Sequence, residues 1–264
     1  MSRLSHLIRS AAASALVALL LAPGLAGGQN AAGPGASATA APAAFRAGER
    51  LDYQIGWSNF LTAATATLLV IEQRAFEGRA AWHFRARAST VAMVRVLYEM
   101  DDQYDSYSDA TTLASYQYEE FQRHQKRNEH KTVRMVPDSE PAREDPAITR
   151  VPRGTRDPLG AFNALRTADW GRTREMRMKV YDGKTLHDLR ARLVVREELA
   201  RVPAGSFRAS KIEIRLYERD RERTDTRFWL WLAHDERRTP VLVEALLPFG
   251  RLRVELKAAS PPAN

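Results

Sequence analysis

The chain has 264 residues, a formal net charge of +8 from 40 Lys and Arg against 32 Asp and Glu, and no cysteine. The missing cysteine excludes disulfide scaffolds, cysteine nucleophiles, cysteine-ligated zinc, iron–sulfur clusters and a lipidated cysteine. A hydrophobic fraction of 44% and a charged fraction of 27% are typical of a globular protein rather than a disordered one.

The first segment of the chain, residues 1–26, has the order of a secretory signal peptide. Two arginines precede an uncharged apolar stretch from Ala11 to Ala22, and small residues follow, so we place the cleavage site after Ala26. The apolar stretch is shorter than the roughly 20 residues that a spanning helix needs, which disfavours an uncleaved anchor. No later segment is long and apolar enough to cross a membrane, so we expect a periplasmic product without a transmembrane segment.

Low-complexity sequence flanks the rest of the chain. Residues 27–44 contain no charge, no aromatic residue and no hydrophobic period, which predicts a flexible Ala/Gly/Pro linker. Residues 258–264, AASPPAN, predict a disordered tail for the same reason. Residues 45–257 have no comparable linker inside them, and we therefore expect a single β-rich domain over this range.

Apolar and polar residues alternate through most of this domain, which is typical of strands with one buried face. The connections are too short for crossover helices, so neighbouring strands are expected to be antiparallel. Asp182-Gly183 separates two such runs, and an Asp-Gly pair in that position is a strong hairpin signal. The alternating runs are residues 51–57, 80–86, 176–180, 187–195, 212–216, 228–232, 241–245 and 252–256.

Two segments have helical spacing instead. Residues 91–98 space their apolar side chains over about two helical turns. Residues 157–166 begin with Asp157 as a cap and Pro158 at the first helical position. Residues 137–156 hold four prolines and mixed charge, which predicts a long surface loop. The sequence therefore predicts an antiparallel, strongly curved sheet or barrel of about ten strands with one or two short helices.

Aromatic and apolar side chains on the alternating strands form the first candidate site. Inside a curled sheet they would line a concave apolar pocket, although ordinary core packing explains the same residues. The ligand-binding candidates are Tyr53, Trp57, Trp82, Phe84, Phe228 and Leu230.

Most of the positive charge is arginine, which binds phosphate in a bidentate manner. Arg150, Arg153 and Arg156 precede the predicted helix, whose free amides favour anions, and these three are the anion-binding candidates. Asp157 competes for the same cap, and a compositional bias towards arginine explains the count without a function. Acids interspersed among the arginines disfavour nucleic acid as a partner.

The sequence contains no catalytic motif, so we predict neither an enzyme nor a cofactor. The histidines lack zinc-site spacing, and the acidic residues 99–109 lack the pattern of a calcium loop, so we predict no metal. A hydrolase whose site assembles from dispersed residues, for example Glu119, His124 and Asp101, is the second alternative function.

Several ordered blocks of the sequence resemble one protein family. Together they resemble the bacterial exported-protein family catalogued as domain of unknown function (DUF) 3108, over almost all of residues 45–257. The resemblance implies a secreted, largely antiparallel β domain of Gram-negative bacteria, and it supplies no activity or catalytic residues. The blocks are FRAGERLDYQIGW (residues 45–57), DPLGAFNALR (157–166), YDGKTLHDLRARLVV (181–195), PAGSFRASKIEI (203–214) and WLWLAHDERRTPVLVEALLPFGRLRVEL (229–256).

The leading hypothesis is a periplasmic, non-enzymatic β-rich protein that binds a lipid or another amphipathic envelope component in the concave face of its sheet. The first alternative is an envelope protein-interaction or scaffold module that uses a sheet edge or the 137–156 loop. The interior discriminates between them, because a deep apolar pocket favours ligand binding and a packed interior favours a scaffold.

Overall fold

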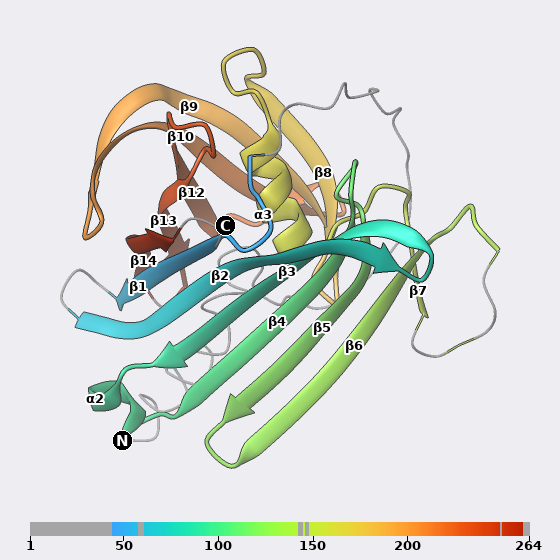
Figure 1. Ribbon diagram of the computed structural model, residues 1–264, viewed down its shortest axis with the longest axis horizontal. Helices are drawn as coiled ribbons and strands as arrows, with labels where there is room; N and C mark the ends of the chain where they lie inside the picture. The colour runs from blue at the N-terminus through green and yellow to red at the C-terminus, as the bar shows by residue number, and fades with distance from the viewer. Residues whose placement is uncertain (1–43, 58–60, 142–144, 146–147, 249, 261–264) are drawn as a thin grey trace.

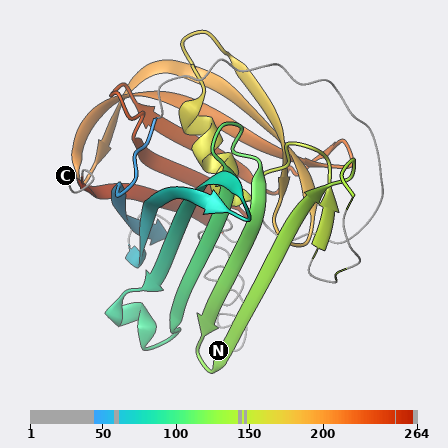
Figure 2. The same cartoon turned by 45° about the vertical axis from the view of Figure 1, so that its right-hand side comes forward.

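The computed structural model describes residues 44–57, 61–141, 145, 148–248 and 250–260. The predicted signal peptide and nearly all of the predicted linker lie outside the described residues. Within them, the strands form one 14-stranded sheet that curls around a helix (Figure 1; Figure 2). The prediction of a mainly β, strongly curved sheet or barrel with short helices is confirmed.

Long hairpins dominate the chain. The strands are β1 (Arg50–Trp57), β2 (Leu61–Phe76), β3 (Arg79–Thr90), β4 (Met100–Asp109), β5 (Ser115–His124), β6 (Arg127–Pro137), β7 (Ile148–Val151), β8 (Glu175–Tyr181), β9 (Leu186–Val202), β10 (Gly205–Glu218), β11 (Arg221–Glu222), β12 (Arg227–Ala233), β13 (Pro240–Leu247) and β14 (Gly250–Ser260). The helices among the described residues are α2 (Ala92–Arg95) and α3 (Pro158–Thr167).

The strand order is β7-β6-β5-β4-β3-β2-β1-β14-β13-β12-β10-β9-β8, with β11 beside β10. Strand β1 joins the two halves of the sheet by pairing with β2 on one side and β14 on the other. The expectation that all neighbouring strands are antiparallel is wrong at β6 and β7, which are parallel. The connection between them is long enough to return the chain in the same direction, so part of the predicted surface loop 137–156 becomes a strand.

The two ends of the sheet approach each other, so the curled sheet is nearly closed. Arg156, just after β7, forms a parallel bridge with Val180 of β8. Farther along, the Lys131 ammonium of β6 donates a hydrogen bond to the carbonyl of Gly183 in the β8–β9 turn. Gly183 has a φ of 87°, as the predicted Asp-Gly hairpin requires.

Helix α3 fills the space that the curled sheet encloses (Figure 1; Figure 2). It begins as predicted, because the Asp157 carboxylate accepts a hydrogen bond of 2.8 Å from the amide of Gly160 and Pro158 takes the first position. Every residue from Pro158 to Arg166 is buried, and the helix packs against β3, β4 and β8. The concave face of the sheet is therefore covered by the chain itself.

The carboxyl-terminal strand is longer than the sequence suggested. Residues 258–264 were expected to be disordered, but Ala258 pairs with Asp52 and Ser260 pairs with Arg50 at the end of β14. Those small, uncharged residues pair with the start of β1, which would otherwise be an open edge there. The tail prediction is thus wrong for Ala258–Ser260, and the rest of it lies outside the described residues.

Gly160 of α3 packs too tightly for a larger side chain. A Cβ atom built there would lie 2.9 Å from the hydroxyl oxygens of both Ser108 and Ser115. Gly→Ala in an open helix stabilises by about 1 kcal/mol, but Gly160→Ala should lower the free energy of unfolding by about 1–3 kcal/mol through overpacking. Urea denaturation of the two proteins measures the difference, and a gain in stability would contradict the close contact.

Candidate functional site

The six aromatic and apolar ligand-binding candidates lie in or against the packed core. Tyr53, Phe84, Phe228 and Leu230 are buried, and Trp57 and Trp82 pack against the same core while partly exposed. The candidates from β1, β3 and β12 thus share one apolar interior.

Other parts of the chain already contact these side chains through a hydrogen bond and ring packing. The Tyr53 hydroxyl donates a hydrogen bond of 2.7 Å to the carbonyl of Pro240. Phe45 meets the rings of Trp82 and Phe84 edge-on, each at 5.2 Å between centroids. The cavity between α3 and strands β1 to β3 measures about 10 Å³, room for about one water molecule. This interior is packed, which favours the protein-interaction or scaffold alternative over a ligand inside the sheet, and places recognition on the outer surface.

The three arginine candidates point to separate partners. The Arg150 guanidinium donates to the carbonyls of Pro137 and Glu140, while Arg153 is exposed. Arg156 donates to the carbonyls of Gly154 and Thr112. Burial lowers the pKa of the Arg156 guanidinium. The Asp157 carboxylate already accepts a hydrogen bond from the Gly160 amide at the amino terminus of α3, so this amide does not support an anion site there. The predicted anion site stays a prediction.

The dispersed hydrolase candidates do not share one face of the sheet. His124 is opposite Met100, on the face that turns towards the core, and hydrogen-bonds the Asp102 carboxylate at 2.9 Å. Asp101 and Glu119 are on the other face, opposite Arg123 and Asp105. These two acids are therefore four residues apart along β4, about 13 Å. That separation gives no convergent acid–base pair.

A prominent exposed feature lies at α2, between β3 and β4. Met93, Val96 and Leu97 are 70%, 86% and 72% exposed. Their i, i+3 and i+4 spacing puts them on one side of the helical segment, while Tyr98 turns into the core. We call these three residues the α2 tip. Large apolar side chains that gather at such a projection mark an interaction surface.

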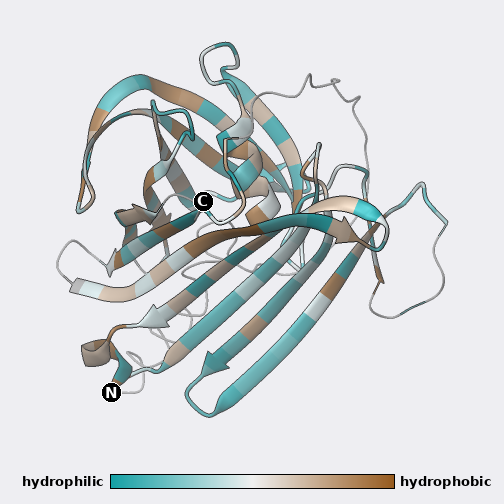
Figure 3. Ribbon diagram, in the orientation of Figure 1, coloured by the Kyte–Doolittle hydropathy of each residue, from teal (hydrophilic) through white to brown (hydrophobic). Residues whose placement is uncertain are grey.

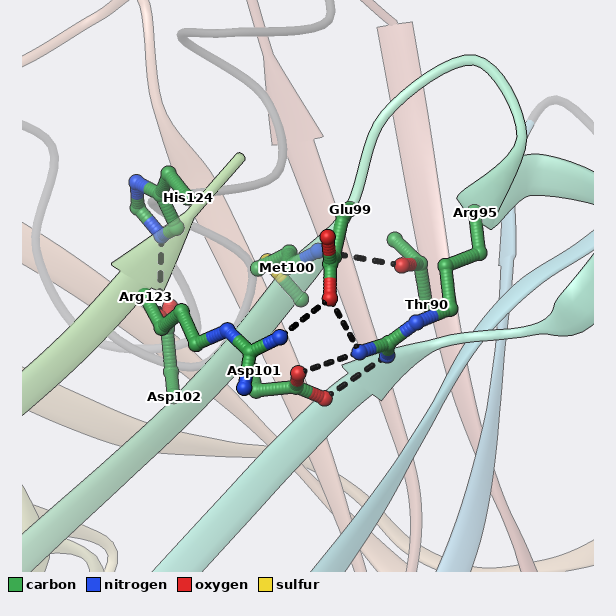
Figure 4. Close-up of polar contacts among 8 residues, drawn as sticks. All are labelled: Thr90, Arg95, Glu99, Met100, Asp101, Asp102, Arg123 and His124. Carbon is green, nitrogen blue, oxygen red and sulfur yellow. Dashed lines mark hydrogen bonds and ion pairs between the residues drawn. The ribbon is translucent and has the colours of Figure 1, made fainter. Parts of the chain in front are cut away.

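Ion pairs hold the α2 tip to the end of the sheet (Figure 4). The Arg95 guanidinium contacts the Asp101 carboxylate at 2.5 and 2.8 Å, and the Glu99 carboxylate at 2.7 Å. Glu99 also contacts Arg123 of β5 at 2.6 Å. The hydrogen bond from Arg95 keeps the pKa of Asp101 below its ordinary value. Four charges in one network fix the projection in place although each pair is partly exposed.

Basic residues flank the α2 tip. The amide of Gln125 in the β5–β6 turn donates to the carbonyl of Glu99, which places the turn beside the helix. Lys126 and Arg127 follow it and are exposed, and neither forms an ion pair within the described part of the chain. Figure 3 shows the largely hydrophobic α2 at the same end of the sheet as the hydrophilic ends of β5 and β6.

The sequence alone did not single out the α2 tip. Residues 91–98 show the helical spacing, but their apolar residues occur on both sides of the helix. Such a pattern is equally typical of a helix covered on both sides. The signal in the sequence was that residues 91–98 contain more apolar side chains than one buried helix face can hold.

The fold and site together define a barrel-like β protein with a filled interior and an exposed apolar projection. The sequence profile of the family described as protein of unknown function (DUF3108) matches residues 52–257. The chain therefore belongs to this family. No curated protein matches the sequence.

One solved structure supports the fold, and two others match it less closely. A beta-barrel-like protein of domain of unknown function DUF1849 from Brucella abortus superposes with a TM-score of 0.50 at 10% identity, covering 80% of this chain and 96% of that one. A lipoprotein candidate from Parabacteroides distasonis gives a TM-score of 0.37 at 10% identity, covering 82% and 98%. An exported-protein candidate from Bacteroides fragilis gives 0.32 at 8% identity, covering 82% and 97%.

Two further observations concern the described residues alone. None of their helices has the length and apolar character to pass through a bilayer. Their His, Asp and Glu side chains form no group of three or more that is arranged to hold a metal ion.

Proposed function

We propose that this protein is exported to the bacterial envelope and binds the surface of a lipid membrane through the α2 tip, without catalysis. The observation that carries the proposal is the set of three large apolar side chains that are 70–86% exposed on one short, anchored segment. The proposal keeps the amphipathic ligand expected from the sequence and moves its contact from the interior of the sheet to the outside.

The packed interior supports this change of place. A lipid chain needs a cavity of several hundred Å³, and the cavity beside α3 offers about 10 Å³. Binding inside would require α3 to leave, and the whole apolar surface of that helix would be exposed to water. Burial of apolar area is the main favourable contribution to folding, so this exposure is strongly disfavoured.

The surroundings of the α2 tip fit an anionic lipid surface. Apolar side chains at such a projection enter the headgroup region by about 5–10 Å. Lys126 and Arg127 are exposed in the β5–β6 turn, whose Gln125 amide hydrogen-bonds the Glu99 carbonyl just after the tip, and they attract anionic headgroups, each by about 1 kcal/mol.

The test is co-sedimentation with vesicles of phosphatidylglycerol and phosphatidylcholine. The triple variant Met93→Ser, Val96→Ser and Leu97→Ser should bind roughly 10–100-fold more weakly than the wild type, because partial burial of three side chains is lost. Binding by the wild type should fall as salt is raised, because Lys126 and Arg127 contribute through charge.

The matched control replaces the other exposed large apolar side chains, with Val194→Ser, Leu199→Ser and Leu246→Ser. This control should bind vesicles like the wild type. Equal binding by the two triple variants would refute the α2 tip as the contact. A single protein adduct from a photocrosslinker at position 93 in cells, without vesicle binding, would favour the scaffold alternative instead.

A further inference from the structure

A second exposed feature is a row of three arginines across neighbouring strands. Arg177 of β8 is directly opposite Arg190 of β9, and Arg190 is directly opposite Arg215 of β10. The side chains of the three arginines lie on the outer face of the sheet. Ala191 follows Arg190 in the chain and Ile214 precedes Arg215, and both of these neighbours belong to the core. Directly opposed residues have Cβ atoms about 5 Å apart, and like charges in that arrangement destabilise a sheet.

The row lines a groove of about 340 Å³ on the outside of the sheet. The volume suits a small ligand, which typically occupies about 300–1,000 Å³. The groove is lined by four arginines and two glutamates, so its lining has a net positive charge. Its lining residues are Glu175, Met176, Arg177, Arg190, Ala191, Arg192, Glu213, Arg215 and Tyr217.

The fixed partners neutralise this charge only in part. Arg215 contacts Glu213 at 3.1 Å and Glu222 at 2.9 Å. The Arg190 guanidinium stacks on the Tyr217 ring, 3.8 Å from its centroid, and contacts the Asp220 carboxylate at 3.8 Å. Arg192 contacts Glu213 at 3.2 Å. The Arg177 guanidinium has no hydrogen-bond or ion-pair partner within the described residues. Arg177 therefore has no counter-charge among the residues that the structure describes.

We infer that this groove binds a ligand with two phosphate groups. Arginine recognises phosphate through paired hydrogen bonds, and apart from its stacking on Tyr217 the Arg190 guanidinium has one ion-pair contact, at 3.8 Å, to the exposed Asp220. Three adjacent strands span about 10 Å, which is longer than a single phosphate or carboxylate. Two linked phosphates reach all three arginines. The inference is independent of the α2 tip, which lies between β3 and β4.

Calorimetric titration with inorganic pyrophosphate at physiological salt tests the site for a free ligand. Wild-type protein should bind, and Arg177→Gln and Arg190→Gln should each weaken binding at least tenfold. Arg177→Gln should also keep or raise the melting temperature without ligand, because it relieves repulsion from Arg190. A merely structural arginine would instead lower the melting temperature when replaced.

Vesicles that contain cardiolipin, which has two phosphates, test the same chemistry in a lipid headgroup. They are titrated into the α2-tip triple variant, so that binding through the tip does not contribute. Loss of pyrophosphate binding or of cardiolipin binding with Arg177→Gln supports the groove as the binding site. The probe whose binding is lost identifies the source of the phosphates. Arg172→Gln, at an exposed arginine outside the groove, is the matched control and should leave affinity unchanged. The inference is overturned if neither probe binds, or if the groove variants bind as the control does.

Discussion

Arg166→Met is expected to lower the free energy of unfolding by about 3–5 kcal/mol, the cost of leaving a buried charge without its partner. Arg166 and Glu49 are each 2% exposed and form two parallel hydrogen bonds of 3.0 Å. The same guanidinium donates to the carbonyls of Ala44 and Arg237. It therefore connects the end of α3 to the start of the described chain and to the β12–β13 turn. Urea denaturation followed by tryptophan fluorescence measures the loss.

The double variant Arg166→Met with Glu49→Leu separates the pair from its surroundings. Removing both charges should recover a large part of the loss, because no uncompensated carboxylate is left in the core. Arg208→Met is the matched control, since Arg208 pairs with Glu197 at 3.0 Å on the surface with both side chains about half exposed or more. Its cost should stay below about 1 kcal/mol. A cost of that small size at Arg166 would contradict the buried-pair interpretation.

Local signals made much of this fold predictable from the sequence. The Asp182-Gly183 pair sets the β8–β9 hairpin, and Asp157 with Pro158 starts α3, because both depend on a few neighbouring residues. The position of α3 depends on distant contacts and was not predictable. The cap residues predict the helix itself, whereas its burial depends on small residues such as Gly160, which let strands pack closely around it. The parallel pairing of β7 likewise depends on a non-local contact.

The row of arginines shows the same limit, because non-local pairing could not be predicted from the sequence. The hairpin places Arg177 opposite Arg190, so that half of the arginine row follows from the sequence alone. The third member does not, because register shifts between Ala209 and Lys211 and between Lys211 and Ile212 displace β9 against β10. Without them, the register at Ala209 would put Arg215 opposite Arg192 and not opposite Arg190. Alternation alone therefore could not show that Arg215 lies next to Arg190.

Asp157→Ala is expected to cost about 2–4 kcal/mol, since it removes a helix cap and leaves buried polar groups without partners. The Asp157 carboxylate is fully buried, accepts from the amide of Gly160 at 2.8 Å, and accepts from the Ser106 hydroxyl at 2.5 Å. Asp157→Asn keeps an oxygen for the Gly160 amide and should cost less than the alanine variant. Equal losses in the two variants would show that charge, and not the cap, matters at this position.

The pH dependence of stability provides a second test of the same residue. Burial raises the pKa of Asp157 above its ordinary value of 3.8, and hydrogen bonds from Ser106 and Gly160 oppose this shift only in part. As the pH rises above 3.8, the unfolded chain loses this proton while the folded chain keeps it. The contribution of Asp157 to stability therefore falls with rising pH until the folded pKa is passed. Asp157→Asn has no such titration, so its stability relative to the wild type should improve as the pH rises above about 4, until the folded pKa is passed. Denaturant midpoints across this range measure the change, and a constant difference between the two proteins would mean that burial does not control this carboxylate.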